Sequence, residues 1–442
     1  MAEDDLALLE QALVVDPLDP ETCLRQAQHL EQQGQWASSL EACRRALALW
    51  PDVTPAYALQ LRLARQQNDQ PLVLESLRLL LRMQPDDALL NSQMGAALCM
   101  AGDFAGAIPF LRAAVPHLGH ANDTLWNYTM ALSAIGAYDE LIRAQPLLDR
   151  LAANGPSPYP PFAHLASAKL ALTFDREAVL AEATALRQSD RWHGGDRVSQ
   201  SLSQAVAARQ PFSLVRLDYA LARFACYVSL HANRVLRQQE LSAVVNSVWE
   251  GWFGATAETL GILFLSHLER MFADALRGAD LIGIPEVEHL RDDPFQFGFL
   301  AEMRQSLPSG PDAAFTSFYI ADILHEAVPY LRPMLSGLPF LGTIGAHPAL
   351  ARKLGHFCGI SDIRSIIVPG DLTRDRLSVG NASGFLPERH LQVLEEITVP
   401  FPGAVFLVSA PGPLGIIYCG RIKSLGGIAI DIGALMDRWA GY

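Results

Sequence analysis

The hydrophobic and polar positions of this chain follow two patterns, one in each half. Up to about residue 198, apolar residues recur at the three- and four-residue spacing of amphipathic helices. From about Ser199, short runs of consecutive apolar residues alternate with helical segments. The first pattern predicts an all-helical region, and the second predicts strands joined by crossover helices. We therefore expect an α-helical unit followed by an α/β unit.

The helical half is punctuated at a fixed interval. A residue that tolerates a left-handed turn recurs every 34 positions, at Gly34, Asn68, Gly102 and Gly136. Small residues at matching positions, such as Ala27 and Gly95, allow two helices to approach closely where they cross. This period and this pattern resemble the tetratricopeptide repeat, a helix–turn–helix unit of about 34 residues.

The repeats predict how the first half is organised. Residues 1–155 are expected to form a tetratricopeptide-repeat solenoid, with a degenerate fourth repeat and a leading helix before the first. Prolines between residues 156 and 161 end the array, and residues 156–198 are expected to form a helical cap or connector. Such arrays usually bind a peptide or protein segment on their concave face. A purely structural or dimerising array is the alternative interpretation.

The second half predicts a mostly parallel sheet. Its strand-like runs are residues 212–217, 279–285, 339–345, 363–369, 403–410 and 426–433. Helical segments between these runs provide the crossovers, so the sheet is expected to be covered on both faces. Residues 199–442 are therefore predicted to form a Rossmann-like α/β domain. Ligands of such domains bind at the carboxyl ends of the strands, so the residues that follow each run are the candidates for a site.

Composition and charge narrow the range of partners. The formal net charge of −13 argues against a general binder of nucleic acid or of anionic membranes, because both require a basic field.

The acidic, amphipathic start of the chain does not resemble a signal peptide. Prolines and glycines punctuate the longest uncharged stretch, residues 401–420, which favours a buried strand, a turn and a helix start over a membrane span. The six scattered cysteines fit reduced core thiols in a cytoplasmic protein.

Two candidate binding features follow the last two strand-like runs. Residues 411–415, Pro-Gly-Pro-Leu-Gly, join a strand to a helix, where backbone N–H groups can bind a phosphate or the turn can serve only close packing. The segment is neither a Walker loop nor a G-x-G-x-x-G motif. Asp431 follows the residues Gly-Gly-Ile-Ala-Ile of the final strand-like run, where it can bond the hydroxyl groups of a sugar or ribose, or can cap the helix that begins near Ala434.

Three further segments contain residues with candidate chemistry. Asp322 and His325 are three residues apart in a predicted helix, which suits an imidazole oriented by a carboxylate for base catalysis, or simply a packed helix. His347 follows one strand and precedes a helix, where a structural role is the simpler interpretation. The tryptophan-rich segment 248–254 fits either a sugar-stacking surface or a core or interface element.

Taken together, these segments resemble one family, the glycosyltransferases of the GT-D fold. The strongest likeness is Gly403–Gly441, which is similar to the family's strand, Gly-rich loop, K-x-x-GG segment and D-I-G ending. Residues 279–285, 321–327 and 344–355 are similar to internal segments of the family. The likeness extends from about residue 210 to 442. It implies a GT-D fold, a nucleotide-sugar donor that is typically UDP-linked, and usually a divalent metal.

The resemblance also assigns roles to individual residues. Within the matching segments, the expected donor-binding residues are Arg216, Gly412, Gly415, Lys423 and Asp431. Ile416 stands where a lysine often follows the Gly-rich loop, so one cation expected to face the phosphates is absent from that position. Residues 385–390, Phe-Leu-Pro-Glu-Arg-His, match a family segment only roughly, because the family's histidine usually lies nearer the start.

The first strand departs from the family at its metal-binding motif. Family members have S-x-V-R-x-G-D-G-E at the end of this strand, and here only Ser213, Val215 and Arg216 match. The two carboxylates of the expected D-x-E pair are replaced by Tyr219 and Leu221. Leucine cannot ligate a metal, and a neutral phenol is a poor substitute for a carboxylate, which argues against a Mn²⁺ or Mg²⁺ cofactor. Asp218 is the one carboxylate that remains there.

Two functions fit these observations. The first is a glycosyltransferase that moves a sugar from a nucleotide sugar to a protein held by the repeats. In this hypothesis Asp218 or the Asp322/His325 pair is the catalytic base, while Arg216 and the N–H groups of Gly412–Gly415 bind the diphosphate without metal. The second is a non-catalytic scaffold that binds partners through its repeats. The replaced acid pair favours the second function, and the retained Arg216, Gly-rich loop and Asp431 favour the first.

Overall fold

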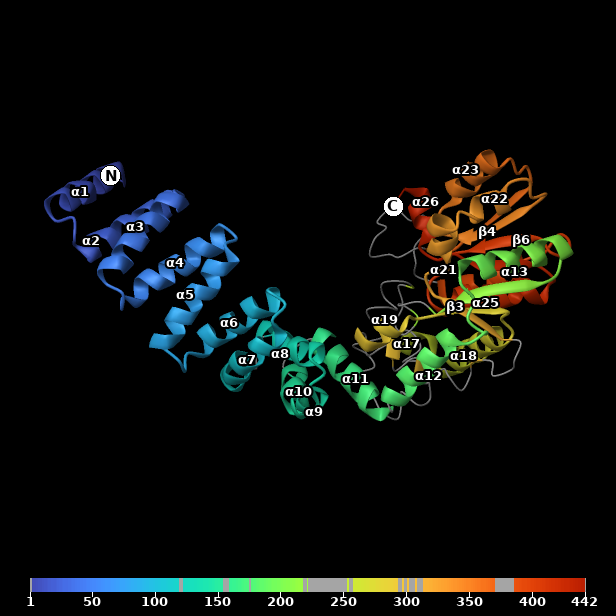
Figure 1. Ribbon diagram of the computed structural model, residues 1–442, viewed down its shortest axis with the longest axis horizontal. Coiled ribbons are helices and arrows are strands. Elements are labelled where there is room, and N and C mark those ends of the chain that lie inside the picture. Colours follow the sequence, from blue (N-terminus) through green and yellow to red (C-terminus); the bar gives the residue numbers. More distant parts are fainter. Residues whose placement is uncertain are drawn as a thin grey trace. The chain divides into compact units, whose positions relative to one another are not determined.

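Figure 1 shows the computed structural model of the chain. The structure describes residues 2–118, 122–153, 159–174, 176–217, 257–292, 313–369 and 385–441, together with positions 221, 253, 296, 297, 300, 301 and 307. The chain divides into two compact units, Met1–His164 and Leu165–Tyr442, and the division falls within helix α11 (Tyr159–Thr173). Helices α12 (Arg176–Gln188) and α13 (Gly195–Ala208) thus belong to the second unit, whereas the sequence pattern set residues 156–198 apart as a connector.

The first unit is a succession of helix–turn–helix pairs (Figure 1). Its helices are α1 (Ala2–Val15), α2 (Pro20–Gln32), α3 (Trp36–Leu49), α4 (Thr54–Gln66), α5 (Gln70–Met83), α6 (Ala88–Met100), α7 (Phe104–Leu118), α8 (Asn122–Ala134), α9 (Tyr138–Arg143), α10 (Gln145–Ala153) and the start of α11. The predicted turn residues all adopt a left-handed backbone, with φ of 72° at Gly34, 54° at Asn68, 78° at Gly102 and 72° at Gly136. The predicted repeats are therefore confirmed by the geometry of the chain itself.

A small buried residue sets the spacing between the two helices of the third repeat. Gly95 in α6 lies against α7, where an added Cβ atom would lie only 2.3 Å from Cγ of Leu111. The carboxylates of Asp19, Asp69 and Asp87 accept hydrogen bonds from the first turns of α2, α5 and α6, which fixes where these helices begin. The fourth repeat is irregular, since its second helix is broken at Ala144 into α9 and α10.

The second unit is built on a seven-stranded sheet with the strand order β3-β2-β1-β7-β6-β4-β5. The strands are β1 (Phe212–Arg216), β2 (Leu281–Ile284), β3 (Ala314–Ser317), β4 (Leu341–Gly345), β5 (Ile363–Ile367), β6 (Val405–Val408) and β7 (Ile428–Asp431). All the paired neighbours within this sheet are parallel. The predicted parallel α/β fold is confirmed, and six strands lie within the predicted runs.

The sequence pattern missed strand β3. The residue pattern from Thr316 onward is typical of a helix, but Ala314–Ser317 pair with β2, and helix α21 (Ile320–Asp322) begins only three residues after the strand. A four-residue strand that runs directly into a helix leaves no periodicity of its own. The outer side of β3 is joined by Trp192, which forms a parallel bridge with Phe315, and by the amide of His193, which donates to the carbonyl of Phe315 at 2.7 Å.

Helices cover both faces of the sheet. One hydrophobic core joins the strands to α13, α21, the π-helical turn η1 (Ile323–Ala327), α22 (Leu331–Leu335), α23 (Pro348–Cys358) and α26 (Leu435–Ala440). Against the opposite face, α25 (Pro413–Ser424) contacts β1, β6 and β7 and packs beside α18 (Ile262–Arg277) and α24 (His390–Glu396). The remaining described helical segments of the unit are α17 (Ala257–Leu260), α19 (Val287–Asp292) and η2 (Phe385–Arg389).

The strand order places a switch point between β4 and β6. The chain leaves β4 through α23 on one face toward β5, and it leaves β6 through α25 on the other face toward β7. Neighbouring strands whose chains depart in opposite directions leave a crevice at their carboxyl ends, which is where ligands of open α/β sheets bind.

Two predictions about buried segments are confirmed. Residues 401–420 form β6, a turn and the start of α25, and no helix in the described part of the chain is both long and apolar enough to cross a membrane. The cysteines of the described residues, Cys23, Cys43, Cys99, Cys358 and Cys419, are buried free thiols. Burial raises the pKa of the Cys43 and Cys99 thiols to about 11, so both remain protonated and unreactive near neutral pH.

Candidate functional site

Two of the predicted donor-binding residues meet at the carboxyl ends of β1 and β7. Nη2 of Arg216, the last residue of β1, donates to Oδ1 of Asp431, the last residue of β7, at 3.2 Å. Nη1 of Arg216 donates to the carbonyl oxygen of Phe318 at 3.2 Å. Both charged side chains are about nine-tenths buried, with exposed fractions of 8% and 10%. A buried pair of this kind requires close compensation, because an isolated charge there would be strongly unfavourable.

Two glycines make room for this pair. Gly433 has a φ of +45°, and a Cβ atom there would lie 1.7 Å from Nη2 of Arg216. A Cβ atom at Gly283 in β2 would lie 3.2 Å from Cγ of Arg216 and 3.0 Å from the backbone of Phe318. The local sequence thus excludes side chains from the space that the guanidinium occupies. Nε of Arg216 is buried and has no hydrogen-bond partner among the described residues.

The carboxylate of Asp431 is held in a fixed orientation. Its Oδ1 accepts a second hydrogen bond, from the amide of Gly433 at 3.0 Å. This bond turns the chain at the end of β7 and leaves α26 without a side-chain cap, since the residue before that helix is Ala434. Asp431 thus closes the turn that leads from β7 into α26, whereas the first turn of the helix itself has no side-chain cap. The other oxygen, Oδ2, lies toward the first turn of α25, 3.9 Å from the position of a Cβ atom at Gly415.

The Gly-rich loop connects β6 to α25 beside Asp431. Gly412 has a φ of 57° and a ψ of −133°, a conformation that side chains disfavour, and it directly precedes the helix. Pro413 has no N–H group, and the amide of Leu414 already donates to the carbonyl of Pro411 at 3.3 Å. Among the first-turn amides, Gly415 therefore remains for a ligand. The positive end of the 12-residue α25 lies at the same place.

The structure places Lys423 far from these residues. At about 1.5 Å per residue, eleven positions of helix separate it from Gly412 by about 16 Å. Its Nζ donates to the carbonyl of Gly278 at 2.7 Å and pairs with Oδ2 of Asp280 at 2.7 Å. Asp280 in turn accepts from the amide of Ser213, at the amino end of β1, at 2.8 Å. Lys423 therefore lies at the edge of the sheet opposite to the other donor-binding candidates.

Asp322 and His325 do not bond to each other in the described structure. Asp322 ends α21, whereas His325 lies in the π-helical turn η1, which alters the predicted helical spacing. Arg438 of α26 pairs with Asp322 and also with Glu326, where Nη1 lies 3.0 Å from Oε1. The ring of His325 packs edge-on against Trp439, with centroids 5.5 Å apart. The arrangement matches the packed-helix alternative.

His347 has a carboxylate partner that sequence spacing could not show. It follows β4 at the switch point, and its Nε2 lies 2.8 Å from Oδ1 of Asp437 in α26. The exposed fraction of the His347 side chain is 11%. Ninety positions separate the two residues, so only the tertiary fold brings them together. Met436, next to Asp437, packs against Gly345 at the end of β4, where a Cβ atom would lie 2.2 Å from its sulfur.

Some predicted residues lie outside the described part of the chain. These include Asp218, Tyr219 and most of the tryptophan-rich segment 248–254. Leu221, which occupies the second position of the expected acid pair, is 1% exposed. The side chain at that position thus belongs to the core.

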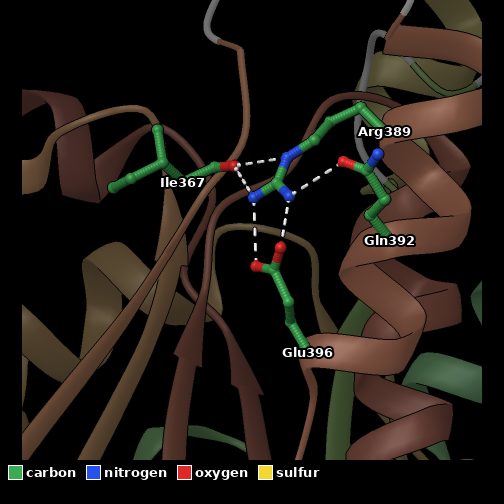
Figure 2. A network of polar contacts seen from close by, with 4 residues as sticks. All are labelled: Ile367, Arg389, Gln392 and Glu396. Carbon is green, nitrogen blue, oxygen red and sulfur yellow. Dashed lines mark hydrogen bonds and ion pairs between the residues drawn. The ribbon is translucent and has the colours of Figure 1, made fainter.

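A further network fixes the outer edge of the sheet (Figure 2). Nε and Nη2 of Arg389 donate to the carbonyl oxygen of Ile367, at the end of β5, at 3.3 and 2.8 Å. The same guanidinium pairs with both carboxylate oxygens of Glu396 and contacts Gln392. Arg389 therefore holds α24 against the last carbonyl of an edge strand, which is a structural role.

The next residue, His390, is part of the core. Its Nδ1 lies 3.1 Å from the hydroxyl of Tyr418, and the two rings are stacked with centroids 5.6 Å apart. Burial lowers the pKa of His390 to about 4, with a smaller contribution from nearby His267. The imidazole is therefore neutral at physiological pH. The segment 385–390 thus contributes packing, in its described residues, and not a catalytic base.

A group of residues beyond β2 and β3 was not among the candidates that the sequence pattern indicated. Glu286 and His289 follow β2, and Phe318 and Tyr319 follow β3. Glu286 was within reach of the rule that residues after a strand are site candidates, since β2 was predicted. Tyr319 was outside the reach of this rule, because the residue pattern around β3 is typical of a helix and predicts no strand there.

The comparisons with known proteins include repeat proteins among the solved structures. No protein-family model matches the chain, and no curated protein matches it. Among solved structures, it is similar to YrrB, described as a TPR protein with an unusual peptide-binding site, with 18% identity and a TM-score of 0.32 over 36% of this chain and 81% of that chain. It is also similar to MamA, with 14% identity and a TM-score of 0.29 over 33% of this chain and 80% of that chain. At these values the assignment of the repeats rests on the chain's own geometry.

Proposed function

We propose that the second unit is a glycosyltransferase-type domain that binds a nucleotide sugar, UDP-linked in the family it resembles, at the carboxyl edge of its sheet. The observation that carries this proposal is the convergence of Arg216, Asp431 and Gly415 at the ends of β1, β7 and β6. These residues come from segments that the GT-D resemblance singled out, and ligands of parallel sheets bind at this edge.

Each of these residues has a distinct role in the proposal. Asp431 accepts hydrogen bonds from sugar hydroxyl groups, since its carboxylate is oriented by Arg216 and by the amide of Gly433. The amide of Gly415 and the positive end of α25 bind a phosphate oxygen. Both Nη atoms of Arg216 already donate within the fold, to the carbonyl of Phe318 and to Asp431, so Arg216 positions Asp431 and contributes positive potential without a direct contact to the diphosphate.

The described residues do not fit a divalent metal at this place. They contain no group of three metal-ligating side chains, and the carboxylate of Asp431 is already bound to the cation of Arg216. A second cation beside that guanidinium would be repelled, and Leu221 offers no ligand atom. We therefore propose that backbone N–H groups, and not a metal ion, stabilise the leaving diphosphate.

Transfer also requires a base for the acceptor hydroxyl. As the acceptor oxygen bonds to the anomeric carbon, its proton passes to the base, and the bond to the diphosphate breaks with its electron pair. Asp218, which lies outside the described residues, remains the proposed base. The contacts of Asp322 with Arg438 and of His325 with Trp439 make that pair the weaker candidate.

We propose further that the repeats hold a protein acceptor or another protein partner. Three large apolar side chains are exposed on the first helices of the third and fourth repeats. They are Leu89 at 59%, Met100 at 74% and Trp126 at 45% exposure. Exposed apolar side chains on a repeat array are typical of surfaces that bind a peptide.

A non-catalytic scaffold is the second candidate function. Leu221, at one of the two positions of the acid pair, is buried, and this favours a domain that keeps the fold without the chemistry. The two proposals differ in one property, since a scaffold of this kind has no need to bind a nucleotide sugar.

The experiment is calorimetric titration of the full chain with UDP and UDP-sugars, with and without Mn²⁺. We expect binding that does not require Mn²⁺ and that weakens about ten- to hundred-fold in Asp431→Asn, because a hydrogen bond to a charged group is lost. Asp280→Asn is the matched control, since this carboxylate lies at the opposite edge, and its affinity should equal that of the unmodified chain. Absence of binding to every nucleotide sugar under both conditions would favour the scaffold.

A further inference from the structure

Three aromatic rings gather at the carboxyl ends of β2 and β3. Tyr319 lies against Phe318 with ring centroids 4.1 Å apart, and His289 lies 5.3 Å from Phe318 and 5.4 Å from Tyr319. Phe318 is 5% exposed and belongs to the core, whereas Tyr319 is 43% exposed. The exposed ring of Tyr319 therefore rests on two packed rings at the edge of the sheet where ligands bind.

This ring is held rigidly. The hydroxyl of Tyr319 lies 3.1 Å from Nε2 of His289, and its amide donates to Oγ of Ser317 at 3.2 Å. The amide of Phe318 donates to the carbonyl of Ile284, at the end of β2, at 3.0 Å. A ring fixed at both ends loses little conformational entropy when a ligand stacks on it.

The aromatic group is connected to the proposed donor site. The carbonyl oxygen of Phe318 accepts the hydrogen bond from Arg216, whose other side holds Asp431. Tyr319 follows β3 and Arg216 ends β1, so only β2 lies between their strands. Two strand spacings amount to about 10 Å, which is close to the length of a nucleoside.

A carboxylate lies next to the aromatic group. Glu286 follows β2 and begins the turn of helix that contains His289, three residues later, so both lie on one side of that turn. Its Oε2 pairs with Nη1 of Arg187 at 2.8 Å, and its side chain is 17% exposed. A carboxylate after the second strand of a Rossmann-like sheet is the group that bonds ribose hydroxyls in dinucleotide-binding domains.

We infer that Tyr319 stacks on the base of the bound nucleotide and that Glu286 accepts hydrogen bonds from its ribose hydroxyls. The inference rests on the proposed function, and it specifies how the nucleotide-sugar donor is oriented along the carboxyl edge of the sheet. The nucleoside lies over β2 and β3, the diphosphate lies near β1 and the start of α25, and the sugar lies toward Asp431 and the switch point. Stacking tolerates any base, so selection of the base falls to other residues.

The test compares a nucleoside, a nucleotide and pyrophosphate as probes of the full chain. Tyr319→Ala should weaken the binding of uridine and UDP roughly five- to hundred-fold, as the loss of one base–aromatic contact predicts. Binding of pyrophosphate alone should be unchanged. Tyr319→Phe keeps the ring and should retain the affinity within about two- to three-fold. Glu286→Gln should weaken uridine binding and leave pyrophosphate binding as it was.

Phe357→Ala is the matched control, since Phe357 is another exposed ring of the second unit, 59% exposed on α23. Its UDP affinity should be that of the unmodified chain. Undiminished UDP binding by Tyr319→Ala would overturn the stacking role while the proposed function stands. A loss confined to UDP-sugar, with UDP unaffected, would assign the ring to the sugar and also overturn it. Absence of nucleotide binding by the unmodified chain would remove both proposals.

Discussion

At the scale of single residues, one buried ion pair organises the candidate site. Arg216 and Asp431 end neighbouring strands, and each compensates the charge of the other where water is excluded. The arrangement depends on Gly433, because any side chain there would overlap the guanidinium. The sequence motif identified Arg216 and Asp431 separately, but their pairing across 215 positions required the fold.

Gly433→Ala tests this dependence. The added methyl group displaces Arg216 and leaves Asp431 without its partner, so we expect a loss of about 3–5 kcal/mol in the free energy of unfolding of the second unit. Gly337→Ala is the control, since Gly337 also has a positive φ, of +79°, but no atom lies within 4 Å of its added Cβ. The control should lose only about 1–2 kcal/mol. Equal losses in denaturant melts would contradict the account.

A second residue-scale prediction concerns pH. The pKa of His390 is lowered by burial to about 4, whereas in the unfolded chain it is about 6.5. The unfolded state therefore binds a proton more readily, so the stabilisation present above pH 6.5 is lost as the pH falls toward 4. The free energy of unfolding of the second unit should fall by about 3 kcal/mol over this pH range.

Chemical denaturation at pH 7 and pH 4.5 measures this effect. His390→Gln cannot take up the proton, so its second unit should lose less stability between the two pH values than that of the unmodified chain. His164 makes the same prediction for the first unit, since burial lowers its pKa to about 4 as well. An identical pH dependence in His390→Gln and the unmodified chain would rule out the assigned role.

At the scale of elements, the sequence predicted the helix pairs of the repeats and the runs that contain six of the seven strands, but it missed β3. The 34-residue repeat fixed the helix pairs because each turn needs a left-handed residue. Strand β3 was missed, since four residues beside a helix carry no pattern. Lys423 was grouped with the Gly-rich loop because both lie in the segment that resembles the K-x-x-GG ending of the GT-D family. Helix α25 separates them, since a helix carries its two ends to opposite edges of the sheet.

The packing of the repeats yields an element-scale prediction. Gly95→Ala places a methyl group 2.3 Å from Cγ of Leu111 and forces α6 and α7 apart, which should cost about 1–3 kcal/mol in the stability of the first unit. Leu111→Ala alone should cost about 2–5 kcal/mol by leaving a cavity. In the double variant the new methyl group enters that cavity, so the total should be smaller than the sum. Additive losses in thermal unfolding would contradict this contact.

At the scale of the whole molecule, the chain joins a repeat array to a parallel α/β domain in two compact units. The proposed division of labour is that the repeats hold a protein acceptor while the sheet holds the donor. The acidic net charge of −13 leaves both tasks to local surfaces rather than to a general field.

The proposed separation of acceptor binding by the repeats from donor binding by the sheet can be tested with a labelled UDP-sugar. Trp126→Glu in the repeats should reduce sugar transfer to protein at least ten-fold, while hydrolysis of the UDP-sugar and its affinity remain unchanged. Leu391→Glu is the matched control, because Leu391 is 45% exposed on α24 of the second unit. Its transfer activity should be that of the unmodified chain. A parallel loss of transfer and hydrolysis in Trp126→Glu would show that the repeats do not act on the acceptor alone.

A crystal structure with a bound UDP-sugar would test the proposal that the carboxyl edge of the sheet binds a nucleotide sugar. We expect density for the base on Tyr319, for the diphosphate at the start of α25 and for the sugar beside Asp431, as this proposal requires. Density for the nucleotide at the opposite edge, beside Lys423 and Asp280, would contradict it. Crystals grown with saturating UDP-sugar would also contradict the proposal if they showed no nucleotide at the carboxyl edge of the sheet, from β3 to β4.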